Sequence, residues 1–314
     1  MPRARHRQAL MRLCRLAIAI GLGLGVGATL LGLLAPWFAP LELINHFRPF
    51  LLGGAAVLLG LAWLVGRHLM RAAATSLAAT NLALALLPLT YGATDAAGRS
   101  PDLRVVTFNM WNKGARARDT ITFLRESGAD VIVLQEAGAA GPIVSALRDT
   151  YPHAVPCPPA RCELRLLAKQ AFSESGRHAR SDDNPPLVWA RFVRNGFSYD
   201  AVGVHLAYPF DPERQEAHVE WLSAFLAQRR HSVVLAGDLN LTPFSWKLAK
   251  LATSAGLRRH GTLLMSFPAH EWVPAVLLDN VLSTTDFATV TIRTGPHLGS
   301  DHLPVIADLA RIGR

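Results

Sequence analysis

The sequence predicts two parts with different folds, a group of transmembrane helices at the N-terminus followed by an α/β domain. Hydrophobic residues make up 50% of the 314 residues, and every long stretch without charge lies before residue 95. Beyond residue 100, short apolar runs alternate with helical segments, which is typical of helices layered on a sheet. We therefore divide the chain into a membrane anchor at 1–91, a short polar linker at 92–102 and a folded domain at 103–314.

Three uncharged stretches, which are 26, 18 and 23 residues long, can each cross a bilayer. A hydrocarbon core of about 30 Å needs roughly 20 apolar residues in a helix. We expect transmembrane helices near 16–38, 50–67 and 72–91, of which the third is the most polar. Four alternating glycines in the first helix would let it approach a neighbour closely, although anchoring in lipid alone is the simpler interpretation.

Basic residues favour the cytoplasmic side of a membrane and so predict the orientation of the chain. Five arginines precede residue 16, and Arg67, His68 and Arg71 lie between the second and third helices, whereas the loop 41–49 has one acidic and one basic residue. We expect a multi-pass protein of the cell inner membrane, with the N-terminus in the cytoplasm and a periplasmic, extracytoplasmic domain. If the third segment does not span, the domain lies in the cytoplasm.

The net charge of +9 is concentrated in the membrane part, because residues 1–99 carry +7 and residues 100–314 only +2. The excess is explained by membrane orientation. A nearly neutral domain gives little reason to expect tight binding to long nucleic acids, which rests on neutralising many phosphates.

Two of the three cysteines, Cys157 and Cys162, are separated by four residues that include two prolines. Prolines favour a turn that brings the two Cβ atoms within the roughly 3.5–4.5 Å that a disulfide needs. We expect a disulfide, which agrees with a domain outside the cytoplasm. The alternatives are a zinc site, which lacks a nearby third ligand, and two unpaired thiols in a cytosolic loop.

Six short apolar runs in the domain have the near-continuous apolarity of strands buried on both faces. They are Leu103–Phe108, Val131–Leu134, Ala201–Val204, Val233–Ala236, Leu277–Leu282 and Leu303–Ala307. The predicted helices are Thr120–Ser127, Ile143–Arg148, Glu213–Gln228 and Trp246–Ala255. This alternation predicts an α/β domain with one or two central sheets.

Nearly every predicted strand is followed or preceded by a polar residue that can bind a metal or a phosphate. Because adjacent strand ends lie at one edge of a sheet, six such ends together predict a single cleft. The candidate residues of this cleft are Asn109, Glu136, His205, Asp238, Asn240, Asp279, Asp301 and His302.

The types of these residues fit the hydrolysis of phosphoesters. Mg²⁺ prefers hard oxygen ligands, which Glu136 and Asp301 can supply. Phosphoryl oxygens need neutral or positive donors, which Asn109, Asn240 and His205 offer.

A water molecule also needs a base or an acceptor that orients it, and a catalytic histidine needs a carboxylate that fixes its tautomer. Asp238, His302 and Asp279 can divide these tasks among them.

The six sequence elements resemble the motifs of the endonuclease/exonuclease/phosphatase superfamily, which includes DNase I, abasic-site endonucleases, sphingomyelinases and inositol-phosphate phosphatases. They occur in the family's order and span Leu103 to Leu309. The resemblance implies a four-layer α/β sandwich with two packed β-sheets. A few N-terminal membrane helices before this domain resemble a bacterial membrane-bound branch. The elements are Thr107–Asn109, Leu134–Glu136, Val204–Leu206, Gly237–Asn240, Leu278–Asn280 and Ser300–His302.

The resemblance also implies a metal-dependent phosphoesterase. Glu136 would be the principal ligand of Mg²⁺, or alternatively of Mn²⁺, with Asn109 and Asp301 near the metal.

The remaining roles concern phosphate and water. His205 would contact the scissile phosphate, Asp238 would orient or activate the attacking water with Asn240 beside it, and His302 would be paired with Asp279.

Some positions depart from the family pattern. A frequent Ser-Arg or Ser-Lys pair is replaced by Ala168-Lys169, Asn280 follows Asp279, and a late Thr-Trp-Pro-like element is Ser266–Pro268. These departures leave the phosphoester substrate open among nucleic acid, lipid headgroup and small phosphoester. No feature indicates an obligate protein partner beyond the substrate and the membrane.

The competing hypothesis is a catalytically inactive, membrane-anchored binding or scaffold domain. A degenerate domain should have lost its acids, yet all four carboxylates of the predicted cleft are present. Seven other histidines match no motif and are expected in surface positions or loops; they are His153, His178, His218, His231, His260, His270 and His297.

Overall fold

The computed structural model describes residues 2–112, 114–157, 162–194, 196–261, 264–269 and 276–312. The chain divides into two compact units. The helical unit comprises Met1–Thr90 with Phe244–Trp246, and the α/β unit comprises Tyr91–Pro243 with Lys247–Arg314.

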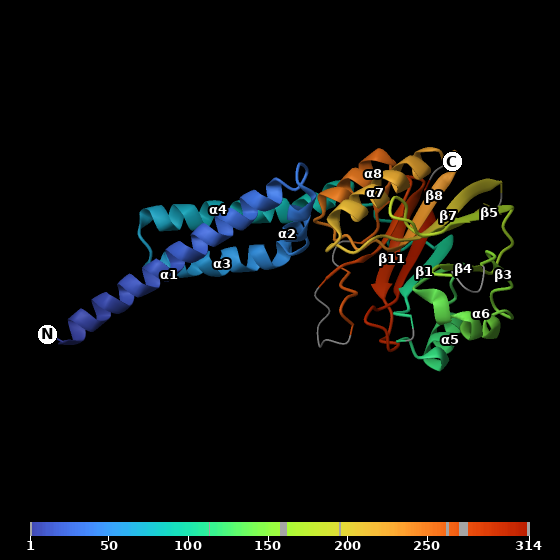
Figure 1. Ribbon diagram of the computed structural model, residues 1–314, viewed down its shortest axis with the longest axis horizontal. Coiled ribbons are helices and arrows are strands. Elements are labelled where there is room, and N and C mark those ends of the chain that lie inside the picture. Colours follow the sequence, from blue (N-terminus) through green and yellow to red (C-terminus); the bar gives the residue numbers. More distant parts are fainter. Residues whose placement is uncertain are drawn as a thin grey trace. The chain divides into compact units, whose positions relative to one another are not determined.

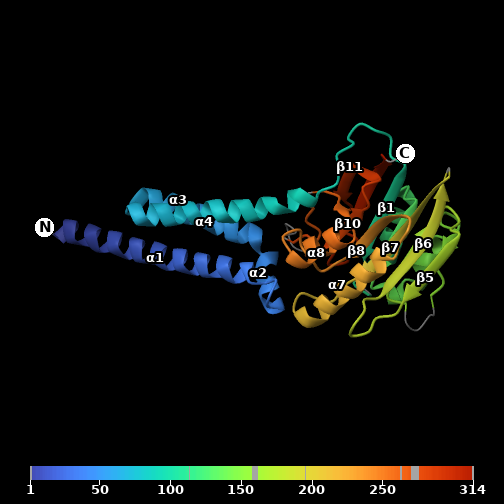
Figure 2. The same cartoon turned by 90° about the horizontal axis from the view of Figure 1, so that it is seen from above.

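The helical unit contains three long helices that run side by side, as Figures 1 and 2 show. They are α1 (Pro2–Leu33), α3 (Arg48–Val65) and α4 (His68–Leu86). By length and composition alone, each is long and apolar enough to cross a membrane. The first helix begins earlier than expected, because arginines continue a helix as well as apolar residues do, and it ends earlier, at Leu33.

Short helical elements that the sequence did not predict follow α1 and α4. A 3₁₀ turn (Ala39–Leu41) leads into the short helix α2 (Glu42–His46), and a second 3₁₀ turn (Leu87–Tyr91) extends α4.

Glycines allow the long helices to approach one another. A Cβ atom on Gly21 would lie 2.8 Å from Leu58 Cδ2, and one on Gly25 would lie 2.8 Å from Leu77 Cδ2. Both distances are shorter than a van der Waals contact, so these glycines serve the close packing of the helices.

Buried polar side chains also connect the helices of this unit. Asn81 on α4 donates to Thr29 Oγ1 on α1 at 3.0 Å, and Arg48 on α3 donates to Asn81 Oδ1 at 3.3 Å. Arg48 also donates to Asn45 on α2. Such bonds satisfy polar groups that would otherwise be buried without a partner.

The α/β unit contains two six-stranded sheets among the described residues. The first has the order β11 (Phe287–Thr294), β12 (Val305–Arg311), β1 (Leu103–Asn109), β2 (Val131–Gln135), β4 (Arg165–Ala168), β3 (His153–Ala154). The second has the order β5 (Glu174–His178), β6 (Leu187–Arg194), β7 (Phe197–His205), β8 (Ser232–Asp238), β10 (Asp279–Ser283), β9 (Arg258–Arg259). In both sheets the central pair, β1 with β2 and β7 with β8, is parallel.

Three apolar clusters make this unit a four-layer sandwich. Val105, Val133, Ala201 and Val234 belong to the cluster between the sheets. Helices α5 (Ala117–Glu126) and α6 (Gly141–Ala146) cover the outer face of the first sheet. Helices α7 (Pro212–Ala227) and α8 (Trp246–Ser254) cover the second sheet, and Figure 1 shows them together over β7 and β8. The expected α/β sandwich of two packed sheets is confirmed.

Strands with alternating burial escaped the sequence analysis. β6 carries partly exposed residues at every second position over its central part, and β5 is exposed or half-buried throughout. Neither has the continuous apolarity that identified the central strands. Continuous apolarity arises only where both faces of a strand are covered, so strands with partly exposed residues are harder to detect.

Residues 92–102 belong to the α/β unit and make backbone hydrogen bonds with its strands. The Ala93 N–H donates to the carbonyl of Arg259, and the Ala96 N–H donates to the carbonyl of Thr289, both at 2.7 Å. The expected polar linker therefore lies against strands β9 and β11.

The expectation of surface positions or loops is wrong for His218, which is buried in α7, and His260 lies in a loop but is also buried. The ring of His218 accepts a hydrogen bond from the Ala207 N–H at 3.2 Å, and the ring of His260 lies 2.8 Å from two hydroxyl groups. Both side chains are buried, because hydrogen bonds to residues distant in the sequence replace the water that a surface histidine would contact. His270 lies outside the described residues.

The predicted disulfide is present between Cys157 and Cys162, whose Cα atoms lie 5.6 Å apart. Cys14 in α1 is free.

We predict that Cys157 and Cys162 resist alkylation in membranes from unreduced cells and become labelled only after reductant is added, because disulfides persist in oxidising compartments. Mass spectrometry of the labelled peptides measures this. Free labelling of both cysteines without reductant would contradict an extracytoplasmic domain, and a reporter fused after Arg314 would then locate the C-terminus.

Candidate active site

Strand pairing brings the predicted residues to one edge of the two sheets. In the first sheet, Asn109 at the end of β1 is in register with Gln135 at the end of β2, directly before Glu136. In the second sheet, Asp238 at the end of β8 is in register with His205 on one side and with Asp279 on the other.

Asp301 and His302 reach the same edge from the other end of the chain. They precede β12, which is antiparallel to β1, so the start of β12 lies beside the end of β1. The Ser300 hydroxyl donates to the backbone carbonyl of Asn109 at 2.7 Å and fixes this connection.

Four non-glycine residues near this edge have a left-handed backbone. They are Trp111, Asn112, Glu136 and Asn240, with φ of 49–50°. For such residues this conformation costs on the order of 1 kcal/mol each and persists where the surroundings enforce it. Its concentration just after β1, β2 and β8 marks these three strand ends as a candidate functional site.

The carboxylate of Glu136 is held by three donors. Asn109 Nδ2 lies 3.2 Å from Oε1, Asn112 Nδ2 lies 3.1 Å from Oε2, and the Tyr208 hydroxyl lies 3.4 Å from Oε1. Burial raises the pKa of Glu136, and the nearby charges of Asp238 and Asp301 act in the same direction. All three donors to Glu136 are neutral groups. Its negative charge is therefore incompletely balanced.

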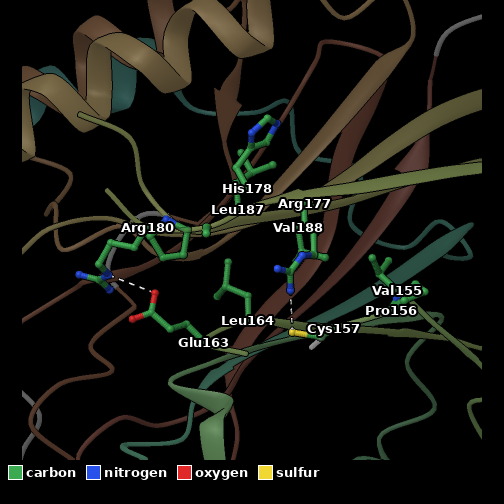
Figure 3. A pocket seen from close by; sticks show the side chains of 12 residues that line it. Val155, Pro156, Cys157, Glu163, Leu164, Arg177, His178, Arg180, Leu187 and Val188 are labelled. Atoms are coloured by element: carbon green, nitrogen blue, oxygen red, sulfur yellow. Dashed lines mark hydrogen bonds and ion pairs between the residues drawn. The ribbon is translucent and has the colours of Figure 1, made fainter. Parts of the chain in front are cut away.

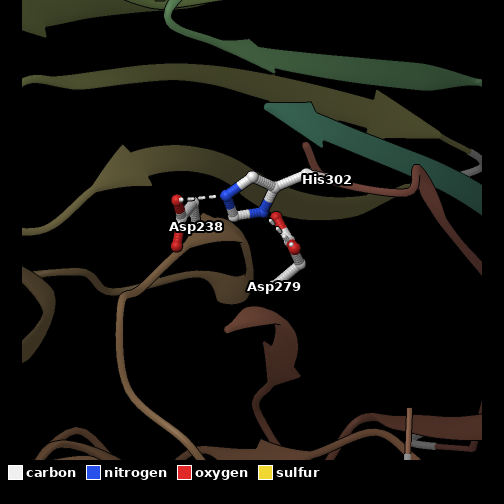
Figure 4. Close-up of side chains that lie close together, drawn as sticks. All are labelled: Asp238, Asp279 and His302. Carbon is white, nitrogen blue, oxygen red and sulfur yellow. Dashed lines mark hydrogen bonds and ion pairs between the residues drawn. The ribbon is translucent and has the colours of Figure 1, made fainter. Parts of the chain in front are cut away.

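His302 lies between two buried carboxylates, as Figure 4 shows. Its Nδ1 is 2.8 Å from Asp279 Oδ2, and its Nε2 is 3.6 Å from Asp238 Oδ2. Burial opposes a charge on the ring, but Asp279, Asp238 and Asp301 together outweigh it and raise the pKa of His302 to about 10. The ring is therefore a cation at neutral pH. The ring of Phe267, from the late loop, lies 4.8 Å from the His302 ring between centroids.

Asp238 accepts hydrogen bonds on both oxygens. The backbone N–H of Asn240 donates to Oδ1 at 2.9 Å, and Asn109 Nδ2 donates to Oδ2 at 3.0 Å. Burial raises the pKa of Asp238, and the positive ring of His302 opposes this shift. The side chain of Asn240 donates to the Leu206 carbonyl at 3.1 Å and thus ties the loop after β8 to the end of β7.

His205 differs from His302 in its charge. Its Nδ1 lies 3.4 Å from a guanidinium nitrogen of Arg180, and its Nε2 lies 3.6 Å from Asp238 Oδ2, too far for a hydrogen bond. Within the described residues, Nε2 is a buried nitrogen without a hydrogen-bond partner. Burial lowers the pKa of His205 to about 4, so this ring is neutral at physiological pH.

A cleft of about 360 Å³ opens beside Glu136 and His205. A second, largely apolar hollow of about 640 Å³ shares Asn112 and Gly138 with it. The residues around the first cleft are Asn112, Glu136, Gly138, Cys162, Glu163, Arg180, His205 and Tyr208.

The sequence analysis missed Asn112, Arg180 and Tyr208. Asn112 and Tyr208 each lie three residues after a predicted site residue, so the loops that follow the strand ends could have indicated them. Arg180 belongs to no motif. Lys169, which the family pattern retained, donates instead to the carbonyl of Gly128 at 2.9 Å and is not among the cleft residues.

The residues present fit a divalent cation. Glu136 has a raised pKa and lies near two further carboxylates, Asp238 and Asp301. A bound cation would balance the negative charge of these three groups. Asp238, Asp279 and His302 also each offer a ligand atom within 4.8 Å of one another. A histidine ligand must be unprotonated, whereas both ring nitrogens of His302 face carboxylates. Glu136 is therefore the better candidate ligand.

The Endonuclease/Exonuclease/phosphatase family model matches residues 106–302, a range that includes all eight predicted site residues. The chain belongs to this family. Its members are hydrolases that act on phosphoester bonds. A search of curated proteins gives no match.

Solved structures of the family share the fold. Sphingomyelinase C from Streptomyces griseocarneus is similar with a TM-score of 0.52 and 21% identity over 66% of this chain and 99% of that one. Beta toxin from Staphylococcus aureus, crystallised with bound magnesium ions, gives 0.52 and 14% over 66% and 99%. TDP2 from D. rerio, in complex with a single-strand DNA product, gives 0.54 and 15% over 66% and 98%.

We predict that Asp279→Asn lowers the pKa of His302 from about 10 toward the ordinary 6.5, because the ring loses its nearest negative charge. An NMR titration of the His302 ring measures this. In the parent protein the pair's contribution to stability is complete below pH 6.5 and is lost as the pH rises through the folded-state pKa. An unchanged pKa in Asp279→Asn would show that Asp279 does not hold the proton on His302.

Proposed function

We propose that the protein is a membrane-anchored, Mg²⁺-dependent phosphoesterase that hydrolyses its substrate by attack of water. The observation that carries this proposal is that Glu136, whose negative charge is incompletely balanced, and the Asp238–His302–Asp279 cluster lie at one edge of the two sheets. Family membership supports the reaction class.

Glu136 is the proposed principal metal ligand, with Asn109 and Asp301 close to the ion. Asn109 and Asn112 donate to the two oxygens of Glu136 and so fix the plane of the carboxylate. When bound, Mg²⁺, or alternatively Mn²⁺, supplies positive charge to the phosphoryl oxygens.

Asp238 is the proposed group that orients or activates the attacking water. The Asn240 N–H and the Asn109 amide hold its carboxylate in place, and Asn240 ties the loop to the end of β7. A raised pKa brings a buried carboxylate closer to the range in which it can accept a proton at neutral pH.

The two histidines are proposed to stabilise the phosphoryl group in different ways. His302 is held as a cation by Asp279 and can balance the charge that develops in the transition state. His205 is neutral and is proposed to donate a hydrogen bond to the scissile phosphate.

The substrate is proposed to be a nucleic acid, a lipid headgroup or a small phosphoester. A net charge of +2 on residues 100–314 disfavours long nucleic acids, and a membrane anchor brings the cleft close to lipid headgroups. We also propose that α1, α3 and α4 span the inner membrane of a bacterium and place the α/β unit outside. The Cys157–Cys162 disulfide supports that side.

We predict that Glu136→Gln lowers turnover about 100-fold or more, since loss of a ligand should exceed the 10–100-fold cost of losing a group that merely supports one. The assay uses the full-length protein in detergent with Mg²⁺, against DNA, phospholipid and p-nitrophenyl phosphate esters in parallel. Glu126→Gln, at an exposed position on α5, is the matched control. Full activity in excess chelator would exclude the proposed metal dependence, whereas no activity on any of these substrates would favour the inactive scaffold.

We predict that His302→Ala and Asp279→Ala are strongly non-additive, because the two residues act as one unit. Each single variant should lose most of the activity, and the double variant should lose little more. The test is a double-mutant cycle, in which kcat is measured for the parent protein, the two single variants and the double variant. Independent losses that simply multiply would disprove the pairing.

A further inference from the structure

Arg180 is the charged neighbour of His205 and belongs to none of the family motifs. It follows β5, and one of its terminal nitrogens lies 3.4 Å from His205 Nδ1. Its Nε lies 3.1 Å from a carboxylate oxygen of Glu163. Figure 3, which draws a neighbouring pocket, shows Arg180 and Glu163 facing each other with a dashed line between them.

A guanidinium group donates hydrogen bonds and cannot accept them. His205 Nδ1 can therefore meet Arg180 only as an acceptor, without a proton of its own. A neutral imidazole carries its single proton on the other nitrogen. The contact thus makes Nε2 the donor of His205.

Nε2 is also the nitrogen that has no hydrogen-bond partner among the described residues. His205 is 2% exposed and is one of the residues around the cleft beside Glu136. A buried donor without a partner is costly unless a ligand satisfies it.

Arg180 itself is held in place by its surroundings. Glu163 balances its charge, and the backbone N–H of Ala137, next to Glu136, donates to the Glu163 carbonyl at 2.9 Å. On the other side, the ring of His218 lies 3.1 Å from the carbonyl of Ser181, the residue that follows Arg180. Arg180 can therefore fix the His205 ring before a substrate arrives.

We propose that Arg180 is a positioning residue that holds His205 in the tautomer with a proton on Nε2, so that this nitrogen donates to a phosphoryl oxygen of the substrate. This inference rests on the proposed phosphoesterase function. A carboxylate at the same place would favour a proton on Nδ1 and a charged ring instead.

The kinetic test measures epistasis between Arg180 and His205 in the full-length protein, with bis-p-nitrophenyl phosphate and Mg²⁺ as the probe. Arg180→Met should lower kcat about 10-fold with little change in KM, the effect of losing a hydrogen bond to a charged group. In the His205→Gln background the same change should cost less than about 2-fold, because a glutamine amide has no tautomer to fix.

Several variants control this test. Arg180→Lys should keep most of the activity, since an ammonium group also only donates. His205→Gln should be more active than His205→Asn, because a glutamine amide nitrogen reaches the Nε2 position and an asparagine amide nitrogen the Nδ1 position. Arg125→Met removes an arginine that pairs with Asp149 at a distance of 3.4 Å. Arg125 is not one of the cleft residues, so this change should leave kcat and KM unaltered.

Equal losses from Arg180→Met in both backgrounds would overturn the proposal. A loss mainly in KM would indicate that Arg180 binds the substrate itself, and a loss of kcat that is equally large in the His205→Gln background would indicate that the Arg180–Glu163 pair only supports the wall of the cleft.

A spectroscopic measurement tests the tautomer without any reaction. Solid-state ¹⁵N spectra of the full-length protein in bilayers, with histidine rings labelled and the His205 signals identified by their absence in His205→Gln, should show an unprotonated Nδ1 and a protonated Nε2. A protonated Nδ1 would refute the proposal even if the phosphoesterase function is correct. The predicted spectrum in a protein without phosphoesterase activity would refute only the function.

Discussion

The buried carboxylate of Asp238 is the group on which the geometry of the site depends. It accepts hydrogen bonds from the Asn109 amide and the Asn240 N–H, and it lies 3.6 Å from the rings of both His205 and His302. A buried charge is tolerated only when it is paired and hydrogen-bonded, so each neighbour must keep its position. The Asp238 carboxylate thereby connects the ends of β1, β7 and β8 with the segment before β12.

The two histidines around Asp238 have different charge states. Burial disfavours the charged form of both rings, and the groups that face each ring decide whether this effect is outweighed. Asp279 faces Nδ1 of His302 and favours the cation, whereas Arg180 faces Nδ1 of His205 and favours the neutral ring. Two identical side chains thus provide a charge and a neutral donor within one site. Separation of pKa values by environment is how one fold assigns different tasks to groups of the same type.

The fold supports this arrangement through its parallel central strands. β1 with β2 and β7 with β8 run in the same direction, so Asn109, Glu136, His205 and Asp238 all lie at the ends of central strands. Antiparallel β10 and β12 bring Asp279 and His302 to the same edge from their starting ends. The strained backbone at Trp111, Asn112, Glu136 and Asn240 occurs just past the strand ends, where the chain must turn sharply.

The sequence by itself determined the central strands, the covering helices, the long apolar helices and the eight candidate residues. These follow from local information, since strands buried on both faces are continuously apolar and polar residues at their ends stand out. The strands β5 and β6 and the burial of His218 and His260 depended on tertiary contacts, because their sequences resemble those of surface segments. Only the folded structure placed Arg180 against His205. They are 25 residues apart in the chain, and no local pattern encodes which face of a loop meets which strand end.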